Sequence, residues 1–243
     1  MLITEENYYS NEVNKEYWSV SQFKAFTRCE ASAKAMLDGK IQMEKSEALL
    51  VGSYVDSAFD GTLEAFKEEH PEIYNRKGEL YAPFKQADVM IARAMSDPKF
   101  MQYMSGQKQV IVTGELFGKK WRGKLDSYIP DVAIVDLKTA TKIGEISKWN
   151  YPLQGAIYQA LVEQQFGKKL PFYLAVVTKE TEPDLHILQI PQSFLDAALD
   201  DVAMNIEHLT EVRDGIVDPV GCGECPWCRK NKKLVVESYE DYL

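Results

Sequence analysis

Residues 123–138, GKLDSYIPDVAIVDLK, decide the fold of this chain. Apolar and β-branched residues lie on both sides of Pro130-Asp131, a dipeptide typical of turns, so the stretch predicts two antiparallel strands joined by a tight bend. If the chain turns around residue 131, Asp126 lies directly opposite Asp136. Two carboxylates in that position repel each other, and a divalent cation between them would reverse the sign of the interaction.

A lysine accompanies this pair of aspartates. Because side chains alternate along a strand, Asp136 and Lys138 point to the same face. Carboxylate oxygens select hard cations such as Mg²⁺ or Mn²⁺, which lower the pKa of bound water and stabilise charge on a phosphoryl oxygen. The stretch therefore predicts a metal site suited to phosphodiester hydrolysis. The alternative is a hairpin whose two aspartates face solvent.

The segments around this stretch predict the α/β class, with a central mixed sheet of about five strands flanked by helices. Runs rich in β-branched and aromatic residues predict strands, and apolar residues at helical spacing predict helices. The expected strands cover 110–117, 120–129, 132–138, 172–179 and 185–190. The expected helices cover 21–37 with Ser21 as N-cap, 46–67, 85–95, 152–166 before Gly167, and a last one from Ser193 to Gly215.

Length and composition predict one domain over 1–243, with a cysteine-containing C-terminal segment at 216–243. The 243 residues are 45% hydrophobic, and 37 acidic residues against 28 basic ones give a net charge of −9. Such a balance excludes general attraction to polyanions. The N-terminal residues do not resemble a secretion signal and no apolar run is long enough to span a bilayer, so we expect a cytoplasmic protein without a membrane partner.

Two local basic groups are candidates for contact with DNA phosphates, and routine surface charge is the alternative. They are Lys119, Lys120, Arg122 and Lys124 beside the predicted hairpin, and Arg229, Lys230, Lys232 and Lys233 near the C-terminus.

Three short motifs, in order, resemble the RecB-type branch of the PD-(D/E)xK nuclease superfamily: Gly123-x-x-Asp126, Asp136-x-Lys138 and Gln154-x-x-x-Tyr158. The resemblance implies a restriction-endonuclease-like core. It also implies that Asp126 and Asp136 hold Mg²⁺ or Mn²⁺ and that Lys138 serves the nucleophile. Gln154 and Tyr158, which share one helix edge at i, i+4 spacing, would support the DNA or the lysine.

Asp56 stands where relatives of this branch usually carry a histidine, on an early helix after a glycine, here Gly52. An aspartate can bind Mg²⁺ at least as readily as imidazole. A further metal ligand and a solvated helix residue are both open interpretations of Asp56.

The resemblance extends to RecE-like exonucleases of phage recombination systems. It implies metal-dependent hydrolysis at the ends of linear duplex DNA, a single-strand annealing protein as partner and a homo-oligomer. The alternatives are an end-trimming nuclease similar to those of CRISPR adaptation, or a non-catalytic DNA-binding protein of the nuclease fold with an iron–sulfur or zinc site.

Four cysteines form the remaining pattern: Cys222, Cys225 and Cys228 in a C-x₂-C-x₂-C run, and Cys29 far upstream. Ferredoxin-type clusters take three thiolates from such a run and a remote fourth, whereas structural zinc more often uses two separate C-x₂-C pairs. A [4Fe–4S] cluster is therefore expected ahead of zinc, and free thiols are the third option. The arrangement is similar to that in AddB-type helicase–nuclease subunits, where a cluster joins the ends of the domain.

Overall fold

A computed structural model describes residues 2–42, 46–234, 236 and 238–242. The chain divides into two compact units, a larger one of residues 1–20 and 44–204 and a smaller one of residues 21–43 and 205–243. Within the described ranges, none of the helices combines the length and the apolar character needed to cross a bilayer. The single nuclease-like domain over 1–243 stays a prediction.

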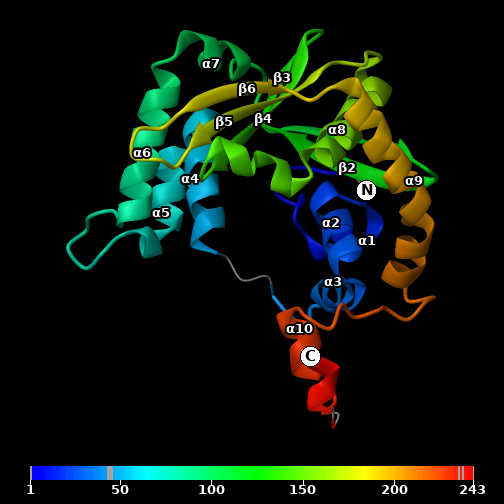
Figure 1. Cartoon of the computed structure of the whole chain (residues 1–243). Helices are drawn as coiled ribbons and strands as arrows, with labels where there is room; N and C mark the ends of the chain where they lie inside the picture. The colour runs from blue at the N-terminus through cyan, green and yellow to red at the C-terminus, as the bar shows by residue number, and fades with distance from the viewer. Residues whose placement is uncertain (1, 43–45, 235, 237, 243) are drawn as a thin grey trace. The chain divides into compact units, whose positions relative to one another are not determined.

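The larger unit contains a four-stranded mixed sheet in the order β3-β4-β5-β6, as Figure 1 shows. Its strands are β3 (Ser127–Ile129), β4 (Ala133–Ala140), β5 (Phe172–Thr178) and β6 (Leu185–Gln189). The β4–β5 pair is parallel and the other two pairs are antiparallel. A separate antiparallel pair consists of β1 (Val110–Leu116) and β2 (Lys119–Leu125). The predicted α/β class is confirmed.

The strand predicted over 120–129 divides at Asp126, because β2 and β3 belong to different sheets. The described strands therefore form two sheets, not one sheet of about five. At the division, the Asp126 carboxylate accepts the backbone N–H of Leu137 at 2.9 Å. A side-chain oxygen thus satisfies a donor that would otherwise pair with backbone, and the ladder is interrupted there.

In the larger unit the helices predicted over 85–95 and 152–166 are present, the one predicted over 46–67 is divided, and α1 and α7 were not predicted. Its helices are α1 (Asn11–Glu16), α4 (Glu47–Asp60), α5 (Leu63–Glu69), α6 (Ala82–Met95), α7 (Pro98–Tyr103) and α8 (Tyr151–Phe166), with short 3₁₀ turns η1 (Pro71–Ile73) and η2 (Ile143–Trp149). The single helix expected over 46–67 was wrong. Gly61 adopts the left-handed conformation, with φ of 77°, and ends α4 there. Glycine tolerates this conformation without a Cβ clash.

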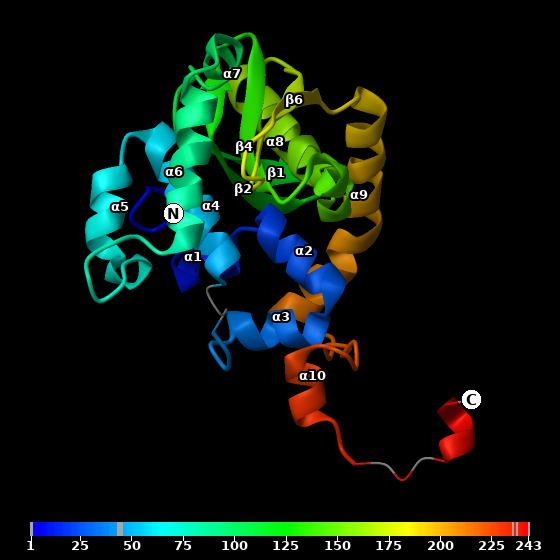
Figure 2. The ribbon, with the colours of Figure 1, turned by 60° about the vertical axis from the view of Figure 1, so that its left-hand side comes forward.

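Strand β4 has two different faces. Ala133, Val135 and Leu137 join an apolar cluster with residues of α4 and α6. The alternate residues include Asp136, whose carboxylate meets Gln154 of α8. Figures 1 and 2 both show α4 and α6 on one side of the β4–β5 pair and α8 on the other. An apolar face thus anchors the strand while the opposite face carries charged groups.

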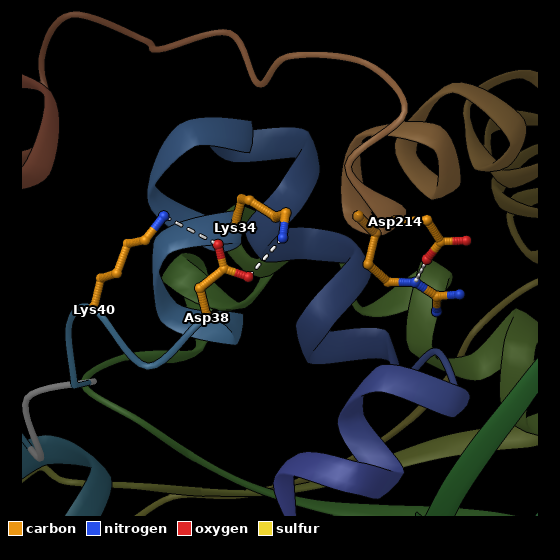
Figure 3. Close-up of polar contacts among 5 residues, drawn as sticks. Lys34, Asp38, Lys40 and Asp214 are labelled. Atoms are coloured by element: carbon orange, nitrogen blue, oxygen red, sulfur yellow. Dashed lines mark hydrogen bonds and ion pairs between the residues drawn. The ribbon is translucent and has the colours of Figure 1, made fainter.

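The smaller unit contains most of α2 (Val20–Arg28), α3 (Glu30–Leu37), the end of α9 (Gln192–Asp214), α10 (Pro226–Asn231) and the 3₁₀ turn η3 (Tyr239–Tyr242). The single helix predicted over 21–37 was wrong. It breaks at Cys29, whose φ of −167° is extended, and it begins at Val20, so Ser21 lies inside the helix. Figure 3 shows that Asp38, just beyond α3, pairs with Lys34 at 2.5 Å and Lys40 at 3.2 Å.

Gly155 is required for the packing of α8 on β5. A Cβ at this position would lie 2.5 Å from a ring carbon of Phe172, which is fully buried. We expect Gly155→Ala to lower the free energy of unfolding by about 1–3 kcal/mol, because overpacking outweighs the gain in helix propensity. Urea titration of the purified chain measures this.

Gly52→Ala is the matched control, since Gly52 also lies inside a helix but a Cβ there would meet its nearest neighbour, Thr139, only at 3.9 Å. It should leave stability unchanged or raise it by up to about 1 kcal/mol. Equal effects of the two substitutions would contradict the steric argument.

Candidate functional site

The pairing of β3 with β4 sets the position of the two motif aspartates. Its register joins Ser127 to Val135 and Ile129 to Ala133, which confirms the predicted turn around residue 131. If this pairing is extended by one residue, Asp126 lies opposite Asp136. Asp126 Oδ2 accepts the backbone N–H of Leu137, the residue after Asp136, at 2.9 Å.

Asp136 lies at the centre of a charged network. It is only 2% exposed, and its two oxygens have different partners. Lys138 Nζ forms an ion pair with Oδ2, and Gln154 Nε2 donates to Oδ1 at 2.7 Å. Burial opposes the charge on Lys138, but Asp136, Asp126 and Asp56 outweigh it and raise the lysine pKa above its ordinary value. Lys138 is therefore an ammonium beside the carboxylates.

Three carboxylates surround this one ammonium. Burial, followed by the charges of Asp136 and Asp56, raises the pKa of Asp126 well above its ordinary value. Burial likewise raises the pKa of Asp56 to about 7, against the opposing effect of Lys138. Asp56 is therefore partly buried and electrostatically coupled to the pair, and the interpretation as a solvated helix residue does not fit its environment.

The three carboxylates are chemically suited to a divalent cation, because carboxylate oxygens are the ligands that Mg²⁺ and Mn²⁺ prefer. Burial is the largest cause of the raised pKa values of Asp126 and Asp56, and the neighbouring carboxylates add to it. Among the described residues, the group whose ligand atoms come close enough together for a metal ion is that of the four cysteines. Binding of a cation by Asp56, Asp126 and Asp136 therefore stays a prediction.

Helix α8 approaches the pair closely because β2 carries a glycine. A Cβ on Gly123 would lie 2.7 Å from a ring carbon of Tyr158, so only glycine leaves room for this ring. Tyr158 is 8% exposed. Burial raises its pKa well above the ordinary value, and a hydrogen bond with Gln154 opposes that shift. Tyr158 thus supports Gln154, which in turn orients Asp136.

Sequence reasoning missed two tyrosines beside the site. The ring centroid of Tyr151 lies 5.5 Å from Lys138 Nζ. Tyr151 precedes Gln154 by three residues on α8, so helical spacing could have identified it. Tyr8 belongs to the N-terminal segment, and burial raises its pKa, with Asp126 as one contributing charge. No sequence pattern connects Tyr8 to the motifs.

One residue of the predicted basic group beside the hairpin was misassigned. Arg122 is 2% exposed, donates to Asn14 Oδ1 at 2.5 Å and lies 4.6 Å from the Tyr8 ring centroid. A buried guanidinium cannot contact DNA phosphates, so Arg122 is a structural residue of the larger unit. Lys120 forms an ion pair with Glu16 at 2.7 Å at the surface.

The four cysteines come together in the smaller unit. Their sulfur atoms all lie within 4.8 Å of one another, although Cys29 is 199 residues from Cys228. Backbone N–H groups of Cys225 and Glu224 lower the pKa of Cys222 to about 6, and the N–H of Cys228 lowers that of Cys225. These amides favour the thiolate form of Cys222 and Cys225, which is the form that binds metals. At Cys228 the N–H of Gly223 acts the same way, but burial and hydrogen bonds with the other cysteines outweigh it and raise the pKa to about 11.

Comparisons with known proteins identify the family of this chain. The sequence family described as "PDDEXK-like domain of unknown function (DUF3799)" matches residues 19–231. A crystal structure from Eubacterium rectale, named "Putative exonuclease", is 49% identical, with a TM-score of 0.96 over 100% of this chain and 98% of its own.

A second crystal structure, that of SSO0001, is 13% identical over 74% of this chain and 85% of its own, with a TM-score of 0.32, which is too low to indicate a shared fold. No curated protein matches the chain. The family match confirms the resemblance to the PD-(D/E)xK superfamily. The chain belongs to the family of PDDEXK-like domains.

Proposed function

We propose that this protein is a Mg²⁺- or Mn²⁺-dependent deoxyribonuclease that hydrolyses phosphodiester bonds at the ends of linear duplex DNA. The observation that carries the proposal is the buried network of Asp126, Asp136 and Lys138 on neighbouring strands. The name of the 49% identical structure, "Putative exonuclease", supports the same activity.

The chain's own residues have separate tasks in the proposed reaction. Asp126 and Asp136 would hold the cation, with Asp56 as a further ligand. When bound, the cation supplies Lewis acidity toward water and phosphate. Lys138 donates a hydrogen bond toward the scissile phosphate and stabilises the negative charge that grows on its oxygens. Gln154 keeps the Asp136 carboxylate in one orientation through the 2.7 Å hydrogen bond.

The resemblance to RecE-like exonucleases supports a biological setting. We propose that the enzyme acts in the cytoplasm in phage-type recombination, with a single-strand annealing protein as partner and as a homo-oligomer on DNA. The cysteine group supports a reducing compartment, because thiolates there stay free of disulfides. All four cysteines are free in the structure.

Mg²⁺ should raise the melting temperature of the wild-type protein, because an ion that binds only the folded state stabilises it. Asp126→Asn should lose most of this increase. The asparagine oxygen can still accept the Leu137 N–H, so the fold is retained. In EDTA the variant should be more stable than wild type by about 1 kcal/mol, because carboxylate repulsion is relieved. Thermal unfolding with and without Mg²⁺ measures both effects.

Asp131→Asn is the matched control for this experiment. Asp131 is an exposed turn residue with φ of 63°, a conformation that asparagine tolerates. It should respond to Mg²⁺ as the wild type does. An equal Mg²⁺ response of Asp126→Asn and wild type would show that Asp126 is not a ligand.

Lys138→Ala should lower the rate of digestion of linear duplex DNA by at least about 100-fold, the usual loss when one donor that stabilises the charge of the transition state is removed. Circular dichroism checks that the variant is folded. Lys148→Ala is the control, because Lys148 is exposed and pairs only with nearby Glu145 among the contacts described. It should digest DNA at the wild-type rate.

A linear and a covalently closed circular duplex of the same sequence serve as paired substrates in Mg²⁺ buffer. We expect degradation of the linear form and survival of the circle. Equal digestion by Lys138→Ala and wild type would overturn the role of the lysine, and digestion of the circle would overturn end dependence. If neither protein digests DNA, a non-catalytic DNA-binding function is favoured.

A further inference from the structure

The distances among the four cysteine sulfurs discriminate between kinds of metal centre. Cys29 Sγ lies 3.5 Å from Cys228 Sγ and 3.8 Å from Cys225 Sγ. Cys222 Sγ lies 4.0 Å from Cys228 Sγ, and every remaining pair is within 4.8 Å. These four atoms are the corners of a compact tetrahedron.

The size of this tetrahedron matches one metal ion. Four sulfur ligands at about 2.3 Å from a central zinc define a tetrahedron with edges of about 3.8 Å. In a [4Fe–4S] cluster each thiolate binds a different corner of a cube, so the cysteine sulfurs stand roughly 6 Å apart. The sulfur positions therefore do not fit the cubane cluster that the sequence pattern favoured.

The surrounding backbone holds the sulfurs at the shorter spacing. Three amides donate to them: Cys222 N to Cys29 Sγ at 3.5 Å, Cys225 N to Cys222 Sγ at 3.3 Å, and Cys228 N to Cys225 Sγ at 3.5 Å. Such bonds orient thiolate ligands and offset part of their charge.

Contacts between the two cysteine-bearing segments hold them together beside the sulfurs. The N–H of Ala31 donates to the carbonyl of Val220 at 3.1 Å, and the N–H of Val220 donates to Glu30 Oε2 at 2.9 Å. Both bonds join residues next to Cys29 to residues just before Cys222.

We propose that Cys29, Cys222, Cys225 and Cys228 bind a single tetrahedral zinc ion within the smaller unit. The ion links the junction of α2 and α3, where Cys29 lies, to the first turn of α10 and the segment before it. The donor set of four thiolates is the usual one for structural zinc with no open coordination position. The ion is therefore structural and takes no part in phosphodiester chemistry. This inference does not depend on the activity of the carboxylate site.

Metal analysis of the full-length protein tests the proposal. The chain is expressed in medium supplemented with both zinc and iron and is purified without air, so that an iron–sulfur cluster would survive. We expect about one zinc atom per chain, no acid-labile sulfide and no visible absorption band. X-ray absorption at the zinc edge should show sulfur ligands alone, at about 2.3 Å.

Cys222→Ser removes one proposed zinc ligand. Cys222 is the exposed member of the group, so its replacement disturbs the core least. Competition with a chelator should show zinc binding at least about tenfold weaker. His208→Ala is the matched control. His208 lies in the same unit and pairs with Glu30 at 2.8 Å, and its replacement should leave zinc affinity unchanged.

Three results would overturn the proposal. Iron and acid-labile sulfide in equal amounts would establish the cluster instead. A wild-type protein without stoichiometric zinc would show that the thiols are free or hold another metal. Loss of zinc in His208→Ala to the same degree as in Cys222→Ser would show a different ligand set.

Discussion

The arrangement of the candidate site depends on carboxylates that lie buried close to one another beside strand β4. Taking carboxylates out of water is costly unless partners replace the lost solvent. Here the Lys138 ammonium and the Gln154 amide contact Asp136, and the Leu137 amide contacts Asp126. Burial and the neighbouring carboxylates nevertheless raise the pKa values of Asp126 and Asp56, so a second charged form at this site is costly.

Close packing of α8 keeps this arrangement in place. Two glycines, Gly123 on β2 and Gly155 on the helix itself, allow aromatic rings to approach at distances that a Cβ would block. The helix can therefore lie near enough for Gln154 to reach Asp136. On the other face of β4, apolar residues pack against α4 and α6. The charged face is thus supported by steric contacts as well as by electrostatic ones.

The smaller unit also brings groups that repel one another, here cysteine thiolates, close together. Residues from distant parts of the sequence meet there through clustered sulfur atoms and backbone amides, in addition to buried apolar side chains. Thiolates that repel one another require a cation, as the carboxylates do. Soft sulfur donors select zinc or iron, whereas the oxygen donors of the other unit select Mg²⁺ or Mn²⁺. The donor chemistry of the two sites therefore favours different metals.

Local patterns in the sequence determined the α/β class, the turn around residue 131, the helix that ends at Gly167 and the spacing of Gln154 and Tyr158. These depend on neighbours within a few residues, so periodicity and turn chemistry suffice to predict them. The tertiary structure decided the strand break at Asp126, the burial of Arg122 and of Asp56, the place of Tyr8 and the distances among the sulfurs. Each of these depends on contacts between segments far apart in the chain, and local patterns carry no information on such contacts.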